Sequence, residues 1–148
     1  YYLGQFEEAV SMYSRAITLA PEDYMLWGSR ADSLWFMESR RDAAVEGYRR
    51  AIELAERNLQ VNDTEGITWA LLAYYYNRVG DADRAARYTE RAMELHPDSP
   101  FVNYFAAIAA ADRGEIEESN RLAKRAVEYG FPMPLIMADP ALPGMRTG

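Results

Sequence analysis

The apolar residues of this chain recur at helical spacing, and no strict alternation of apolar and polar residues persists long enough to indicate a strand. Three sets of apolar residues each share one helical face: Trp27, Ala31, Leu34 and Trp35; Trp69, Leu72, Ala73 and Tyr76; and Ala85, Tyr88, Ala92 and Leu95. The stretch between Pro21 and Pro97 contains no proline, which would interrupt a helix. The pattern therefore predicts an all-α fold of short helices in antiparallel pairs.

Turn-forming residues separate these helical patterns. They lie at Gly4-Gln5, Glu38-Ser39, Gly80-Asp81 and Gly114-Glu115. A first helix is expected from Gln5 to Ala20, and an overlong helix is expected to include residues 51–60.

The spacing of small residues reveals an internal repeat. An alanine follows Gly80 after five residues, and Ala92 follows seven residues later; Gly4 is followed by alanines at the same two distances. The interval from Gly80 to Gly114 equals the interval from Ala92 to Ala126, a period of about 34 residues. A single helix pair of this length cannot bury its apolar face alone, so about three or more pairs must stack to form a continuous core.

The complete repeat resembles the tetratricopeptide repeat, because Trp69-x2-Leu72-Ala73-x2-Tyr76 precedes the alanines of the second helix and the closing Pro97. This resemblance implies an α-α superhelix whose first helices line a concave face. The chain is accordingly divided as one domain, residues 1–148: a partial repeat 1–23, a long repeat 24–65, a regular repeat 66–99, a degenerate repeat 100–133 and a capping tail 134–148. The degenerate repeat carries Asn103 and Ala110 where the family has Trp and Tyr.

The tail has a resemblance of its own. Gly130-Phe131-Pro132, followed by Ile136, Asp139-Pro140, Leu142 and Arg146, is similar to the end of C-terminal tetratricopeptide domains in large bacterial signalling proteins. Such proteins carry a kinase, a cyclase or a DNA-binding regulator domain upstream. The resemblance implies that Leu135, Ile136 and Leu142 cover the apolar face of the last repeat.

Composition removes most kinds of chemistry from consideration. The chain has 148 residues, a formal net charge of -7, no cysteine and one histidine. The acidic balance argues against nucleic-acid binding, because that affinity rests on Lys and Arg. Thiolate metal sites are excluded and His96 alone cannot form a zinc site, so no metal or cofactor is expected. No nucleophile elbow or phosphate-binding loop is present, so an enzyme is not expected. No apolar run is long enough to span a bilayer, and a cytoplasmic location is expected. The start at Tyr-Tyr-Leu, without an initiator Met, suggests a fragment of a longer protein.

Charge is concentrated on the second helices. Acid precedes base at i,i+4 in Glu46–Arg50, Glu53–Arg57 and Glu117–Arg121, as expected of exposed helix faces. By contrast, residues 66–77 and 99–111 of the first helices carry no charge. Neighbouring repeats cover two sides of a first helix, so the third side is predicted to form an aromatic, largely uncharged groove.

The family resemblance assigns groove positions to the first helices. The predicted partner-binding residues are Met25, Asp32, Trp35, Tyr74, Asn77, Arg78, Phe101, Tyr104 and Ile108. Lys is absent from the groove positions that a family member would use to clamp an acidic chaperone tail. We therefore expect a protein–protein interaction scaffold that binds a protein or peptide segment, with no role for nucleic acid or membrane. The alternative is an intramolecular regulatory or self-association module of a larger bacterial signalling protein.

Overall fold

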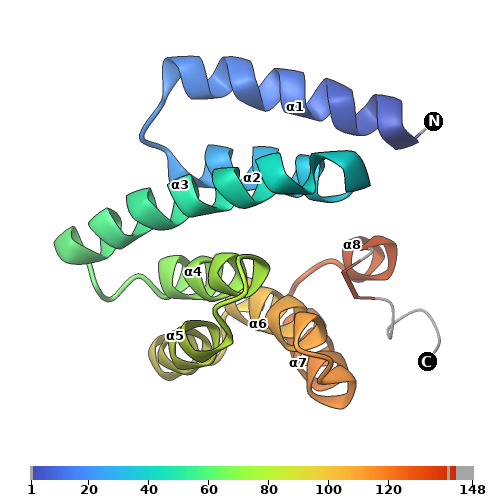
Figure 1. The fold of residues 1–148 in the computed structure, drawn as a ribbon. Helices are drawn as coiled ribbons and strands as arrows, with labels where there is room; N and C mark the ends of the chain where they lie inside the picture. The colour runs from blue at the N-terminus through green and yellow to red at the C-terminus, as the bar shows by residue number, and fades with distance from the viewer. Residues whose placement is uncertain (1, 140, 143–148) are drawn as a thin grey trace. The chain divides into compact units, whose positions relative to one another are not determined.

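The computed structural model describes residues 2–139, 141 and 142, and in this part of the chain every regular element is helical (Figure 1). The chain forms two compact units, the first ending at Val61 and the second beginning at Asn62. The first unit contains α1 (Tyr2–Leu19), α2 (Tyr24–Trp35), a 3-10 turn η1 (Glu38–Arg40) and α3 (Arg41–Val61). The second contains α4 (Gly66–Arg78), α5 (Ala82–Leu95), α6 (Pro100–Asp112), α7 (Ile116–Glu128) and α8 (Met133–Ala138).

The predicted all-α architecture is confirmed. In the first unit α2 packs on α3, and in the second α4 packs on α5 and α6 on α7. The overlong second helix is present, because α3 runs from Arg41 to Val61. The predicted turn at Gly4-Gln5 is wrong, since Gly4 lies inside α1. A glycine costs a helix only about 1 kcal/mol relative to alanine, so the apolar pattern around it prevails.

One hydrogen bond recurs at the start of each helix pair. The Trp27 indole donates to the carbonyl of Pro21 at 2.9 Å, and the Trp69 indole donates to the carbonyl of Asp63 at 2.8 Å. In the degenerate repeat the Asn103 amide donates to the carbonyl of Pro97 at 2.9 Å. Asn103 therefore keeps the function of the missing tryptophan, which is to satisfy a turn carbonyl six residues earlier.

Three helices of the second unit end in the same way. Gly80, Gly114 and Gly130 have φ values of +90°, +78° and +115°, a conformation that side chains with a Cβ rarely adopt. After the first of these, the Asp81 N–H donates to the carbonyl of Tyr76 at 2.8 Å, which is the long bond of a Schellman motif. Equivalent bonds run from the N–H of Glu115 to the carbonyl of Ala110 after α6, and from the N–H of Phe131 to the carbonyl of Ala126 after α7. The chain therefore leaves α7 toward the tail through the same kind of turn by which it leaves α4 toward α5.

Small residues lie where helices come closest. Of the second-helix alanines expected to face a neighbour, Ala51, Ala92 and Ala126 are fully buried, whereas Ala16 of α1 is only half-buried. In the first unit a Cβ built on Gly47 would lie 3.1 Å from that of Ala31, so α2 and α3 are already in contact there. These contacts fix each helix pair through shape rather than through polar groups.

The first helix is the least covered of the long helices. Its apolar residues Phe6, Val10, Tyr13 and Ile17 are all only half-buried, although Phe6 stacks on Phe36 with ring centroids 5.8 Å apart. We expect amide hydrogen exchange, measured by mass spectrometry, to be faster in α1 than in α2 to α7, because local opening there exposes little additional apolar surface. Equal protection of α1 and α3 in a monomer would contradict this.

Candidate functional site

Three of the predicted groove residues lie in the first unit. Met25 is 42% exposed, whereas Asp32 and Trp35 are half-buried. The Asp32 carboxylate accepts a hydrogen bond from the Tyr48 hydroxyl at 2.5 Å. The Trp35 ring meets the Tyr48 ring edge-on at 6.0 Å, and the Arg41 guanidinium lies 4.4 Å from the Trp35 ring centroid. Asp32 and Trp35 are thus held by two residues of α3, Tyr48 and Arg41.

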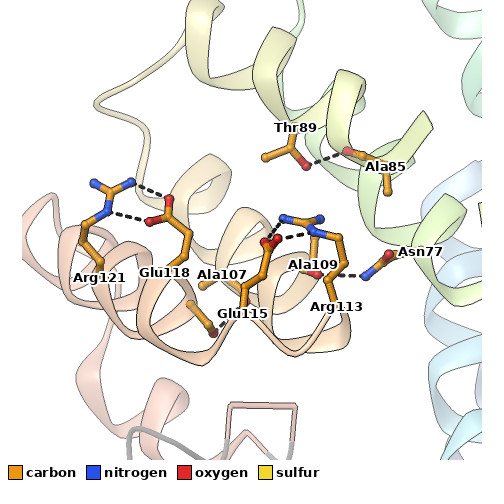
Figure 2. Close-up of polar contacts among 10 residues, drawn as sticks. Asn77, Ala85, Thr89, Ala107, Ala109, Arg113, Glu115, Glu118 and Arg121 are labelled. Carbon is orange, nitrogen blue, oxygen red and sulfur yellow. Dashed lines mark hydrogen bonds and ion pairs between the residues drawn. The ribbon is translucent and has the colours of Figure 1, made fainter. Parts of the chain in front are cut away.

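The other six residues lie in the second unit, where three of them form a polar cluster between α4 and α6. Arg78 Nη1 lies 3.1 Å from the Asp112 carboxylate, and Arg78 Nε donates to the Tyr74 hydroxyl at 3.3 Å. The Asn77 amide donates to the carbonyl of Ala109 at 2.8 Å (Figure 2). The Arg78 side chain is only 6% exposed, so this cluster joins two successive first helices rather than facing solvent.

The carboxyl group of Asp112 is electrostatically unfavourable in this cluster. Burial raises the pKa of Asp112 above its ordinary value, and the nearby carboxylate of Asp139 raises it further. The charges of Arg78 and Arg113 and a hydrogen bond from Asn77 lower this pKa without cancelling the effect of burial. The folded chain therefore holds a proton on Asp112 more tightly than the unfolded chain does.

This shift predicts a pH dependence of stability. Where the folded state binds more protons than the unfolded state, the free energy of unfolding falls as the pH rises. The wild-type chain should therefore lose stability relative to Asp112→Asn as the pH rises through and above the ordinary aspartate pKa of about 3.9. Urea unfolding of both proteins between about pH 3 and pH 7 measures the difference. A difference that grows in favour of wild type with rising pH would show that the sign is wrong.

Two predicted residues of α6 form an aromatic seat, defined as Phe101 and Tyr104. The Tyr104 ring stacks on Phe131 with centroids 4.3 Å apart and an interplanar angle of 16°, and Phe101 meets Phe131 edge-on at 5.8 Å. The Tyr104 hydroxyl donates to the carboxylate of Asp139. The seat is therefore in contact with residues on both sides of α8.

The short helix α8 continues the register of the repeat by one further period. Leu135 follows Phe101 by one period, and the two are 58% and 56% exposed. Ile136 follows Val102 by the same interval, and both are buried. Of the residues expected to cover the last repeat, Ile136 and Leu142 are buried but Leu135 is not. Adjacent residues of a helix point about 100° apart, so Ile136 and Leu135 cannot both face inward. Pro140 and Arg146 of the predicted tail lie outside the described residues.

The predicted groove residues of the second unit differ in how exposed they are. Tyr74 and Ile108 are each 4% exposed, whereas Phe101 is 56% exposed. A partner approaching this structure would therefore meet Phe101 before Tyr74 or Ile108. The repeat period does not indicate Phe131 and Asp139 as neighbours of Tyr104, because neither of them lies one period from it.

Charge on the second helices is arranged somewhat differently from the prediction. Glu53 pairs with Arg57 at 2.9 Å as expected, but Arg50 also pairs with Glu53. Arg121 pairs with Glu118 rather than with the expected Glu117 (Figure 2). Residues three apart are also neighbours on a helix surface, which permits these pairs.

Within the described part of the chain, no three His, Cys, Asp or Glu side chains are grouped so that they could hold a metal ion. His96 is exposed, and its Nε2 lies 3.3 Å from the carbonyl oxygen of Thr64, which is a turn contact. None of the described helices combines the length and the apolar character needed to cross a membrane.

Comparison with known proteins gives the following likenesses. The chain is 29% identical over 96 residues to the Hsp70-Hsp90 organizing protein of Triticum aestivum; the match covers 65% of this chain but only 15% of that protein. A crystal structure of MamA has 16% identity and a TM-score of 0.44, covering 85% of this chain and 89% of that one. A structure described as MamA MSR-1 C2 has 19% identity and a TM-score of 0.41, covering 85% and 68%. Family models described as tetratricopeptide repeat match residues 67–109 and 1–23 of this chain.

Proposed function

We propose that this chain is a protein-interaction module that binds a partner segment through apolar side chains presented by its first helices. The observation that carries the proposal is an accessible apolar residue at the repeat position of Phe101 in every first helix. Met25 of α2, Phe101 of α6 and Leu135 of α8 are exposed, and Ile67 of α4 is half-buried. Exposed apolar residues that recur at one position of a repeat are typical of an interaction surface.

Within the second unit this surface is an apolar ladder, defined as Ile67, Phe101 and Leu135. Asn77 and Arg78 hold α4 against α6 and so fix the spacing of the ladder. Tyr104 borders the ladder at the aromatic seat, while Tyr74 and Ile108 are buried. In the first unit, Met25 is the proposed contact residue, and Asp32 and Trp35 are the other residues of that unit proposed to contact a partner.

The chemistry of the ladder favours an apolar partner segment. The wheat relative is named for organizing Hsp70 and Hsp90. The groove positions at which a family member would clamp an acidic chaperone tail carry no Lys in this chain. The second and fifth positions of the first helices in this chain are Met25, Gly28, Ile67, Ala70, Phe101 and Tyr104, none of which is charged. Binding through such residues should weaken only slightly with added salt, since screening acts on exposed charges rather than on buried apolar area.

Truncating the centre of the ladder tests the proposal. Phe101→Ala should weaken partner binding by at least about 1–2 kcal/mol, because exposed aromatic anchors commonly dominate an interface. The control is Arg87→Ala, an exposed change on α5, which should leave the affinity unchanged. The partner is isolated by pull-down from the source cell and titrated against wild type and both variants by calorimetry. Equal losses for the two variants, or a loss for Arg87→Ala alone, would place the site elsewhere.

A second candidate function is an intramolecular regulatory or self-association module of a larger bacterial signalling protein. The contact of Phe131 and Asp139 with Tyr104 favours it, since here a segment of the chain itself lies against a first helix. Concentration-dependent sedimentation of the purified chain, abolished by Phe101→Ala, would support this alternative over binding of a separate partner.

A further inference from the structure

The aromatic seat on α6 is in contact in this structure with a segment of the same chain, residues 131–142, of which 131–139, 141 and 142 are described. Phe131 at its start stacks on Tyr104 and meets the edge of Phe101. Asp139 near its end accepts the hydrogen bond from the Tyr104 hydroxyl. Between and beyond these two contacts, the segment buries Ile136 completely and leaves Leu142 1% exposed.

This segment takes the place of a further first helix but has only part of one. The helix α8 contains six residues, about half the length of α6. Its Met133 and Leu135 are 44% and 58% exposed. By comparison, α6 is joined to α4 through the hydrogen bond of Asn77 and the ion pair of Arg78, and it packs on its own second helix α7. A short helix with an exposed apolar side opens locally at lower cost than a helix packed on two neighbours.

The Asp139 carboxylate supplies the polar part of the contact. It accepts from the Tyr104 hydroxyl through one oxygen and from the N–H of Ala141 through the other. Its position is therefore fixed both by the seat and by the turn that follows α8.

We propose that residues 131–142 are an intramolecular ligand of the aromatic seat, and that the seat accepts a partner segment of the same chemistry once this ligand is released. That chemistry is an aromatic ring, then a buried aliphatic residue in a short helical turn, then a carboxylate: Phe-x4-Ile-x2-Asp in this chain. The hydroxyl of Tyr104 favours a carboxylate at the last position, because a hydrogen bond to an ionised acceptor is stronger than one between neutral groups. The partner's role rests on the function proposed above, whereas occupation of the seat by the segment does not.

An external ligand can bind only those molecules in which the seat is open. Its apparent affinity is therefore the intrinsic affinity multiplied by the fraction of open molecules. The probe is a fluorescently labelled synthetic peptide of residues 129–142, titrated into the full chain by anisotropy. Asp139→Ala in the chain alters the intramolecular ligand but not the seat, so the peptide should bind this variant at least about tenfold more tightly than it binds wild type. The matched control is Asp98→Ala, an exposed acid in the turn before α6, which should bind the peptide as wild type does.

Two further measurements decide between outcomes. Adding Tyr104→Phe to Asp139→Ala should remove much of the gain, because the peptide's carboxylate loses its donor. Hydrogen exchange of Asp139→Ala should be faster at residues 133–142 only. The proposal is overturned if the peptide binds wild type and Asp139→Ala equally, if Tyr104→Phe changes nothing, or if exchange accelerates throughout α4 to α7. The peptide titration uses no external partner. It can therefore support the intramolecular ligand even if Phe101→Ala leaves partner binding intact. Equally, it can contradict the intramolecular ligand while Phe101→Ala weakens partner binding.

Discussion

Tyr48→Ala is expected to lower the free energy of unfolding of the first unit by about 3–5 kcal/mol, as for other fully buried aromatic residues. Tyr48 is 0% exposed on α3, its ring meets the edge of Trp35, and its hydroxyl donates to Asp32 at 2.5 Å. The truncation therefore leaves a cavity between α2 and α3 and removes a donor from a half-buried carboxylate. Denaturant unfolding, with hydrogen exchange of α2 and α3 to locate the effect, measures the loss.

The conservative variant separates the two causes. Tyr48→Phe keeps the ring packing and removes only the hydroxyl, so it should cost about 1.5–3 kcal/mol, the contribution of a hydrogen bond to a charged group. Arg49→Ala changes the next residue of α3, which is exposed, and should stay within about 0.5 kcal/mol of wild type. A cost below about 1 kcal/mol for Tyr48→Ala would mean that α2 and α3 do not pack as described, since a filled core site cannot lose an aromatic ring so cheaply.

The regular features of the fold were predictable because they repeat. The period of the repeat located the helix pairs, and glycines with positive φ do end α4 and α6. Even the departure at Asn103 proved conservative in function, because its amide supplies the N–H that the tryptophan indole supplies elsewhere. The equivalence of Asn and Trp was not foreseen, since the two side chains share little beyond that donor.

The detailed surface of the candidate site was less predictable. Arg78 and Asp112 occupy the same position in successive repeats, so their opposite charges at a spacing of one period could have indicated the ion pair in advance. The burial of Ile108 could not be read from the spacing. Register specifies which side of a helix a residue occupies, but it does not specify what covers that side. The contact of Asp139 with Tyr104 depends on where α8 ends and the chain turns, which is set by local turn hydrogen bonds.

The register within the second unit can be tested at the site where it matters most. Ala92 of α5 is 0% exposed and packs in one cluster with Ala70 of α4 and Val102 of α6. The position thus faces the other helix of its own pair and the first helix of the next. Ala92→Leu adds three carbons to a contact among three helices, and overpacking of this kind costs about 1–3 kcal/mol.

The expected loss for Ala92→Leu is read as a lower denaturation midpoint, with the slope of the transition unchanged. Ala86→Leu is the matched control, because the same substitution on the exposed side of α5 should change stability by no more than about 0.5 kcal/mol. If both variants unfold at the wild-type midpoint, Ala92 does not lie at the closest approach of the helices. The repeat register that places Phe101 and Leu135 at equivalent positions of the ladder would then lose its physical basis. A loss confined to Ala92→Leu instead supports close helix approach as the reason that this position carries alanine.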